Sequence, residues 1–262
     1  GERWSRLKNL RKSALHYQHA LKHAGPDTDA LRMGGAIHCA LLEPEFFASR
    51  YVTYAGDKCK GEGARKAWAK FQAAHSHMVI LSTDEWTRAH AVAASVRGHS
   101  DAGQLLAKGR AEVPLTWTDE RTGIACKCRL DWETPRRQLV EIKSALNIEQ
   151  HSFANMAWKY GYFHQVEYYA QGLAAQLGTT SEDIECFIVA VESSPPYDVC
   201  VFCPDSESMY AAREELGGFL AKLKECRALD RWPGRYAERT FLTAPRYVLD
   251  SEDDEWQVAV RS

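Results

Sequence analysis

Three consecutive segments in the middle of the chain, residues 111–118, 124–133 and 138–144, alternate polar with apolar or β-branched side chains. This two-residue period is typical of β-strands, because successive side chains on a strand point to opposite faces. Short connections join the segments, so they predict an antiparallel three-strand meander. The apolar side of such a sheet must be covered by another layer, which constrains how the rest of the chain folds.

The segments on either side of the meander have helical patterns or form further strands. Asp27 and Thr28 are candidate caps for one helix, which Glu43-Pro44 should end. Further helices are expected at residues 4–24, 83–108, 162–177 and 206–227, and strands at 184–192 and 197–203. This order predicts an α+β fold with a central mixed β-sheet flanked by helices. We interpret residues 1–262 as a single domain, with a mainly helical part at 1–110, the sheet and its helix at 111–205, and a C-terminal helix and tail at 206–262.

Composition excludes several classes of protein. The hydrophobic content of 45% and charged content of 26% are those of an ordinary soluble globular chain. No stretch of about 18 consecutive apolar residues is available to span a membrane. The first residues do not resemble a secretory signal, so the eight cysteines are expected to be free thiols in a reducing cytosol. The formal net charge of −2 argues against binding nucleic acid through overall positive charge, so any such surface must be local.

The second and third strands of the meander carry two carboxylates and a lysine. A turn centred on residue 136 places Asp131 opposite Glu141, with Cβ atoms about 5 Å apart. Alternation puts Lys143 on the same face as Glu141. The opposite face, expected to be the core side, would carry Leu130, Trp132, Val140 and Ile142.

Two carboxylates this close repel each other unless a proton or a cation lies between them. Their oxygens favour a hard cation such as Mg²⁺ or Mn²⁺. Such an ion lowers the pKa of an attacking water and stabilises the leaving oxygen of a phosphate ester. Lys143 could hold that water or neutralise charge that develops on the phosphate. The alternative, from the residues alone, is a surface ladder of paired charges.

Asp131 followed by Glu141-Ile142-Lys143 resembles the D…(D/E)xK signature of the PD-(D/E)xK nuclease superfamily. Upstream, residues 34–44 (GGAIHCALLEP) resemble the G-x-x-x-H-x-x-L-L-E-P helix of RecE-like phage and prophage exonucleases. Glu112 lies where this group and the lambda-type alkaline exonucleases carry an acidic residue. Downstream, residues 165–169 (QVEYY) are similar to the Q-x-x-x-Y helix motif of RecB-like and lambda-type nucleases. The resemblance covers about residues 28–175 and implies a restriction-endonuclease-like core.

The resemblance also implies a role for each matched residue. Metal ligands would be Asp131, Glu141, the main-chain carbonyl of Ile142, His38 from the preceding helix and Glu112, which would bind or orient a second ion. The catalytic set would be Asp131, Glu141, Lys143, Gln165, Glu112 and Tyr169. Gln165 and Tyr169, one helical turn apart, would steady the lysine, the water or the scissile phosphate. The alternatives are a core histidine at 38, a core aromatic residue at 169 and ordinary strand surface at 112.

The implied activity is the Mg²⁺-dependent degradation of one strand of linear double-stranded DNA from its 5′ end, with Mn²⁺ as a possible substitute. In phage-type recombination this would supply single strands to an annealing protein in the cytoplasm of a bacterial host cell. Rival interpretations are an endonuclease or a RecB-like nuclease on the same core. Interpretations of another class are a DNA-end-binding protein without catalysis and an unrelated domain with a coincidental E-x-K.

Two basic segments are candidates for DNA contact. Residues 56–70 read as a flexible basic loop that enters a helix and could follow phosphates, or could be a solvated loop, with Lys58, Lys60, Arg65 and Lys66. Arg6 and Ser13 have the R-x₆-S spacing with which lambda-type exonucleases grip a 5′ phosphate, although two polar residues of an amphipathic helix would look the same.

Assembly and cofactors follow from the same resemblance. Because the net charge is −2, processive digestion would need a ring, and lambda-type exonucleases are homotrimers. We expect residues 56–70 to line the bore and the acidic residues 251–255 to lie outside. Some RecB-like nucleases carry an iron–sulfur cluster on four cysteines. Here Cys200 and Cys203 point to opposite faces of a predicted strand and the next cysteine is Cys226, so we expect no cluster.

Overall fold

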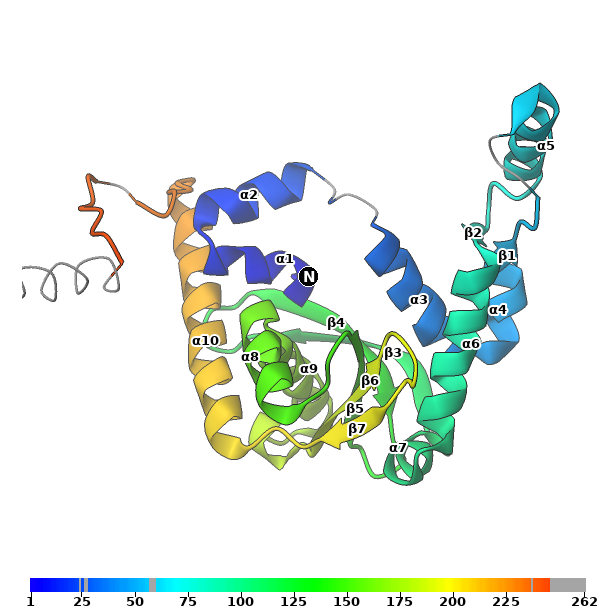
Figure 1. The fold of residues 1–262 in the computed structure, drawn as a ribbon. Helices are drawn as coiled ribbons and strands as arrows, with labels where there is room; N and C mark the ends of the chain where they lie inside the picture. Colours follow the sequence, from blue (N-terminus) through cyan, green and yellow to red (C-terminus); the bar gives the residue numbers. More distant parts are fainter. Residues whose placement is uncertain (24, 26–27, 57–59, 237, 246–262) are drawn as a thin grey trace, which may run out of the picture.

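The computed structural model describes residues 1–23, 25, 28–56, 60–236 and 238–245. Its centre is a five-stranded sheet in the order β3-β4-β5-β6-β7 (Figure 1). The first three strands form the expected antiparallel meander, β5 and β6 run parallel, and β7 returns antiparallel. The α+β fold with a central mixed sheet is therefore confirmed. The strands are β3 (Arg110–Thr118), β4 (Ala125–Glu133), β5 (Leu139–Ala145), β6 (Cys186–Glu192) and β7 (Val199–Phe202).

Helices cover both faces of this sheet, because both faces are apolar. One face packs through Val140, Ile142 and Val189 against α3 (Asp29–Leu42) and α6 (Thr83–Gly98). The other packs through Leu139 and Ile188 against α8 (Gln150–Tyr160) and α9 (Tyr162–Leu177). These two helices form the crossover that parallel pairing of β5 with β6 requires. The remaining helices of the body are α4 (Pro44–Arg50), α7 (Ser100–Leu106), η2 (Ser181–Asp183) and α10 (Ser206–Leu229).

The N-terminal segment closes one end of the molecule. It consists of α1 (Trp4–Leu7), η1 (Lys8–Arg11) and α2 (Ala14–Lys22), and packs through buried Trp4, Leu7 and Tyr17 against β4, α9 and α10. Glu2 forms a parallel bridge with Cys126 of β4. Figure 1 shows α1 and α2 on one side of the sheet end and α3 on the other.

A small outlying unit lies beyond α4. β1 (Tyr51–Thr53) and β2 (Val79–Leu81) pair in parallel, and α5 (Gly61–Ala74) connects them. Figure 1 shows α5 standing away from the five-stranded sheet, and no residue of α5 is buried. The basic segment 56–70 therefore enters a helix at Gly61, as expected, whereas Asp57 to Cys59 lie outside the described residues.

Most predicted elements are present, but the single helices expected at 4–24 and 83–108 are each divided, the first into α1, η1 and α2 and the second into α6 and α7. Thr28 caps α3 by accepting from Leu31 N at 3.2 Å, and α3 ends at Leu42 before Pro44. The sequence analysis missed α8, whose first turn is polar, and the short elements α4, β1 and β2. Among the described residues no helix has the length and hydropathy to cross a membrane.

The strand faces differ from the prediction at one point. Trp132 pairs with Val140 as expected, but Leu130 belongs to the opposite core, with Leu139 and Val113. The change occurs beside Glu112 of β3, which has a φ of 53° and is missing from the ladder between the pairs Ala111–Trp132 and Val113–Leu130. The face opposite the predicted core side is also covered by helices, and Glu141 is only 1% exposed.

Candidate active site

The predicted catalytic residues converge where β4 and β5 diverge. The paired ladder ends at Trp132 and Val140; beyond it the Asp131 carboxylate accepts a hydrogen bond from Ile142 N at 2.9 Å. A cleft of about 870 Å³ opens there. Of the residues singled out from the sequence, its lining includes His38, Glu112, Asp131, Ile142, Lys143, Gln165 and Tyr169.

Three side chains from three elements form a group suited to a metal ion. His38 of α3, Glu112 of β3 and Asp131 of β4 each offer one ligand atom, and these atoms lie within 4.8 Å of one another. His38 Nδ1 is 3.6 Å from Asp131 Oδ1. Burial lowers the pKa of His38, and the Lys143 charge adds to this effect, so the imidazole is held neutral, as a ligand must be. His38 thus lies in the cleft wall rather than in the closed core.

Glu141 is neither in this group nor in the lining of the cleft, and one of its carboxylate oxygens is unsatisfied. Its Oε1 accepts from Gln165 Nε2 at 2.6 Å and from Lys143 Nζ, whereas Oε2 is buried and has no hydrogen-bond partner. Burial, reinforced by the charge of Asp131, raises the pKa of Glu141 to about 7. Burial likewise raises the pKa of Asp131 to about 6, against the opposing effect of Lys143. A nearby cation would stabilise both ionised carboxylates, so the donor set fits a hard divalent ion.

Side chains of α9 hold Lys143 in place. Its Nζ donates to Gln165 Oε1 at 3.2 Å and lies 4.9 Å from the centre of the Tyr162 ring. Burial alone would lower the pKa of Lys143, but the carboxylates of Glu141 and Asp131 raise it overall, so the ammonium stays charged. Gln165 Nε2 also lies 3.1 Å from the Tyr169 hydroxyl. Tyr162, Gln165 and Tyr169 share one face of α9, as a 3.6-residue period requires.

The predicted DNA-contacting residues do not join this cleft. Arg6 is exposed on α1, and the Ser13 hydroxyl caps α2 by accepting from His16 N at 3.2 Å. Lys60 precedes α5, and Lys66 on α5 forms an ion pair with Glu62 at 2.7 Å. None of these, nor Arg65, lines the cleft, and Lys58 lies outside the described residues.

Sequence reasoning missed several residues that do line the cleft: Arg3, Lys8, Tyr162, Lys127 and Arg129. For the two on β4 a signal was present. Lys127, Arg129 and Asp131 alternate along one strand, so they occupy the same face. The sequence near Arg3 and Lys8 holds no such signal, because these residues reach the cleft through contacts of the N-terminal segment with β4, which lies more than a hundred residues further along the chain.

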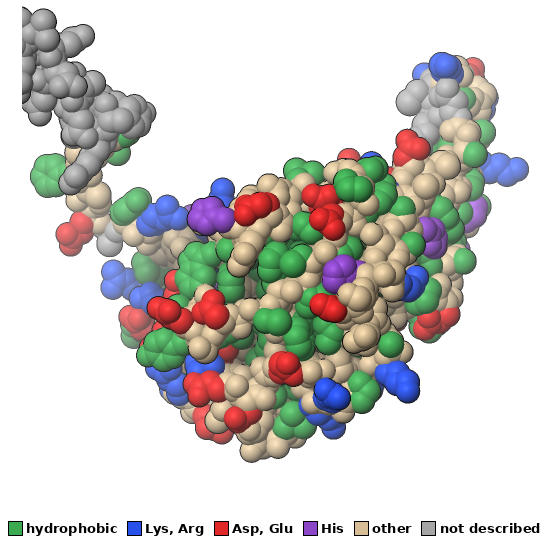
Figure 2. All heavy atoms as spheres, turned by 60° about the horizontal axis from the view of Figure 1, so that its bottom comes forward, with side chains coloured by type: hydrophobic (Ala, Val, Ile, Leu, Met, Phe, Trp, Pro, Cys, Tyr) green, Lys and Arg blue, Asp and Glu red, His purple; other side chains and the backbone are tan. Residues whose placement is uncertain are grey.

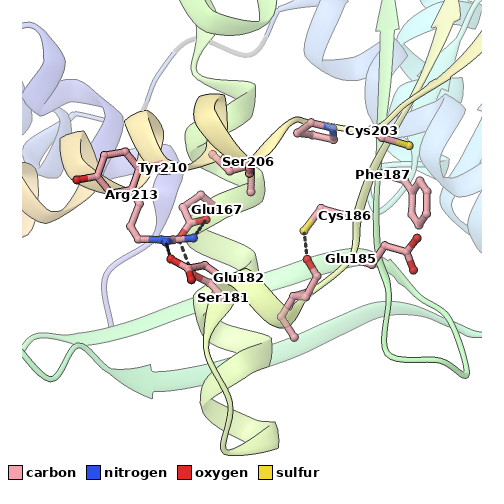
Figure 3. Close-up of a pocket in the computed structure, with 13 residues that line it drawn as sticks. Glu167, Ser181, Glu182, Glu185, Cys186, Phe187, Cys203, Ser206, Tyr210 and Arg213 are labelled. Carbon is pink, nitrogen blue, oxygen red and sulfur yellow. Dashed lines mark hydrogen bonds and ion pairs between the residues drawn. The ribbon is translucent and has the colours of Figure 1, made fainter.

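A second cavity of about 500 Å³ lies between the end of α9, β6 and α10 (Figure 3). Most of its charged groups are paired: Arg213 Nε donates to Glu167 at 2.8 Å, Arg213 also pairs with Glu182, and Glu185 accepts a hydrogen bond from Gln138. The Ser181 hydroxyl donates to the same buried Glu167 at 2.7 Å. Since these charges are satisfied, the arrangement is a structural network rather than a rival active site.

Comparison with known proteins agrees with this geometry. Residues 4–242 match the model of a family described as a PDDEXK-like domain of unknown function (DUF3799). The chain belongs to this family. A crystal structure from Eubacterium rectale, described as a "Putative exonuclease", is similar with a TM-score of 0.59 and 12% identity, over 93% of this chain and 89% of that one. That likeness shows the fold alone. Comparison with curated proteins gives no match.

Membership of the PDDEXK-like family supports a nuclease. Asp131 lies on β4, and Glu141 and Lys143 lie on β5; Asp131 and Lys143 line the cleft. The broader superfamily assignment made from the sequence is therefore confirmed. The narrower likeness to RecE-like and lambda-type exonucleases stays a prediction.

Proposed function

We propose that this PDDEXK-like protein is a metal-dependent nuclease that hydrolyses phosphodiester bonds of DNA in the cleft between α3, the β3–β4 ribbon and α9. One observation carries the proposal. Glu141 is 1% exposed, has a buried oxygen without a partner and lies beside a second carboxylate of raised pKa, that of Asp131. A fold that needed these residues only for stability would not leave two repelling carboxylates in this state.

The residues of the site have different roles in the proposed reaction. Asp131, Glu141, Glu112 and His38 would hold the divalent ion, with the carbonyl of Ile142 as the further ligand implied by the motif. When bound, that ion lowers the pKa of a water molecule and offsets charge on the phosphate. Lys143 points its charged ammonium at the same place and can donate to a phosphate oxygen. Gln165 fixes both Lys143 and Glu141, and Tyr169 supports Gln165.

The oxygen-rich donor set favours Mg²⁺, and the imidazole of His38 also suits Mn²⁺. The finer activity that we propose is 5′-to-3′ digestion of one strand of linear duplex DNA in phage-type recombination, beside a single-strand annealing protein. It is supported by the RecE-like sequence at residues 34–44, whose His38 reaches the cleft together with Glu112 and Gln165.

A time course on linear duplex DNA labelled at either end, with Mg²⁺ or with EDTA, tests this function. We expect Mg²⁺-dependent release of nucleotides from the 5′-labelled end, and none in EDTA. Glu141→Gln should be inactive, and Lys224→Gln, on the exposed side of α10, serves as a matched control. Nicking of closed circular DNA would instead indicate an endonuclease. Binding of DNA ends by the wild type without cleavage would contradict the nuclease and indicate an end-binding protein.

A further inference from the structure

The basic residues that line the cleft fall into two groups. Lys143, Arg129 and Arg50 each form an ion pair, with Glu141, Glu112 and Glu43 respectively. Within the described part of the chain, the other three basic residues of the lining form no ion pair or side-chain hydrogen bond; these are Arg3, Lys8 and Lys127. Unpaired positive charges in a concave site indicate an anionic ligand.

The three unpaired residues come together through the free edge of β4. Beyond the point where β5 diverges, the chain around Glu2 takes its place: Glu2 N donates to Ala125 O, and Lys127 N donates to Glu2 O, both at 2.7 Å. This bridge places Arg3 next to Lys127. Lys8 follows at the start of η1, after buried Trp4 and Leu7 anchor the segment.

Lys8 also approaches the catalytic lysine. The walls of the cleft partly desolvate its ammonium group, and this effect, together with the charges of Lys143 and Lys12, lowers the pKa of Lys8. Lys8 and Lys143 line the same cleft. Because like charges repel, an anion between them would stabilise both.

The basic residues without an ion-pair partner lie on one side of the group formed by His38, Glu112 and Asp131. Asp131, Arg129 and Lys127 stand at every second position of β4, and all three line the cleft; alternate residues of a strand are about 6.8 Å apart. This spacing suits successive phosphates of an extended nucleic-acid strand. At the other end of the cleft Arg50 is already neutralised by a two-point ion pair with Glu43. The face shown in Figure 2 has acidic and basic side chains interspersed, which agrees with a local rather than a general basic surface.

We infer that Arg3, Lys8 and Lys127 form a phosphate track, which holds the backbone of one DNA strand on a single side of the scissile phosphate. This inference rests on the proposed nuclease function. The ligand is the phosphodiester backbone, independent of base sequence. Gripping the strand on one side suits an enzyme that works from an end, since only one side of the cleaved bond remains attached to a long chain.

The first test measures binding without cleavage. Binding of a fluorescent single-stranded oligonucleotide is followed by anisotropy over a series of salt concentrations, with Ca²⁺ in place of Mg²⁺. Each lost phosphate contact should reduce the slope of log K against log salt by about 0.7. Arg3→Gln/Lys8→Gln/Lys127→Gln should therefore lower the slope by about 2, whereas Lys224→Gln should leave it unchanged. Circular dichroism confirms that the variants fold.

An unchanged slope in the folded triple variant would overturn the track, even if the wild type cleaves DNA. A lower slope in a protein that never cleaves DNA would keep the track and reject the nuclease function. The two ideas are thus separable.

The second test addresses the one-sided grip. Single neutral methylphosphonates replace the first or second phosphate on either side of the scissile bond. Substitution on one side should raise KM several-fold for the wild type and much less for the triple variant, and substitution on the other side should have little effect on either. Equal effects on both sides would contradict the asymmetry.

Discussion

The buried carboxylate of Glu141 has features that indicate a functional role rather than a purely structural one. Its Oε2 has no partner, and burial together with Asp131 raises its pKa to about 7. Replacing such a group by a neutral amide of the same size removes the repulsion while keeping the packing. The amide also loses the ion pair with Lys143, so the loss of activity should far exceed any change in stability.

The first prediction separates the roles of the residues around Glu141. Glu141→Gln should remove metal-dependent cleavage and leave the fold intact or more stable. Lys143→Ala should lower kcat roughly 10²–10³-fold, because it removes a charge directed at the phosphate. Gln165→Ala, which only positions the other two, should cost roughly 10–100-fold. Single-turnover cleavage rates give the measurement, and full activity in folded Glu141→Gln would reject the site.

At the scale of elements, the decisive feature is the kink in the β3–β4 ribbon. Glu112 has a φ of 53° and is absent from the ladder, although its neighbours Ala111 and Val113 pair regularly with Trp132 and Leu130. The kink directs Trp132 and Leu130 into different cores and leaves Glu112 and Asp131 at the cleft. A left-handed conformation costs a residue other than glycine about 1–2 kcal/mol.

The second prediction compares two variants that remove the same carboxylate. Glu112→Gly relieves the left-handed strain, whereas Glu112→Ala retains it. We expect the glycine variant to unfold with a free energy about 1 kcal/mol higher than that of the alanine variant, in urea titrations. Both should lose metal affinity and cleavage to the same extent. A less stable glycine variant would show that the backbone at Glu112 is not strained.

At the scale of the whole molecule, the N-terminal segment forms one wall of the cleft and is held there by aromatic packing. Trp4 stacks on the buried ring of His164 at 5.5 Å between centroids. His164 Nε2 lies 2.9 Å from Glu215 Oε2 of α10, and its Nδ1 is buried without a partner. Arg11 of η1 also lies near Glu215, at 3.9 Å. One histidine thus joins three parts of the chain.

The third prediction concerns pH. Burial lowers the pKa of His164, although Glu215 opposes this effect. The unfolded chain, whose histidine has the ordinary pKa of about 6.5, then takes up a proton before the folded protein does. The contribution of His164 to stability should therefore be fully present above pH 6.5 and be lost as the pH drops below it. His164→Phe should reduce the loss in unfolding free energy between pH 7.5 and 5.5, whereas exposed His77→Gln should not. Equal losses in all three proteins would remove His164 from this role.

The fourth prediction concerns assembly. We propose a homotrimeric ring, because a chain of net charge −2 cannot stay on DNA by overall attraction and would need the DNA to be enclosed. Residues 251–255, expected outside such a ring, lie beyond the described residues. Sedimentation equilibrium at micromolar concentration should give three times the mass of the chain. A monomer would contradict the ring, and digestion should then be short and sensitive to salt.

The sequence alone determined the elements whose patterns are local. Alternation located β3, β4 and β5, the turn placed Asp131 and Glu141 together, and Gly161 and Gly178 bounded α9. Each of these follows from preferences that act over a few residues, namely side-chain alternation, capping and glycine conformations. The D…ExK motif is local in the same sense, because its residues lie on two strands joined by one short turn.

Only the tertiary structure decided what surrounds that motif. The bridge between Glu2 and Cys126 brings Arg3 and Lys8 to the cleft, and nothing in the local pattern near residue 2 specifies a partner so far along the chain. The left-handed Glu112 and the burial of Glu141 beneath α9 likewise arise from packing between separate elements. Such contacts join segments that are far apart in the sequence, and the local pattern of a segment shows which face is buried but not which distant segment covers it.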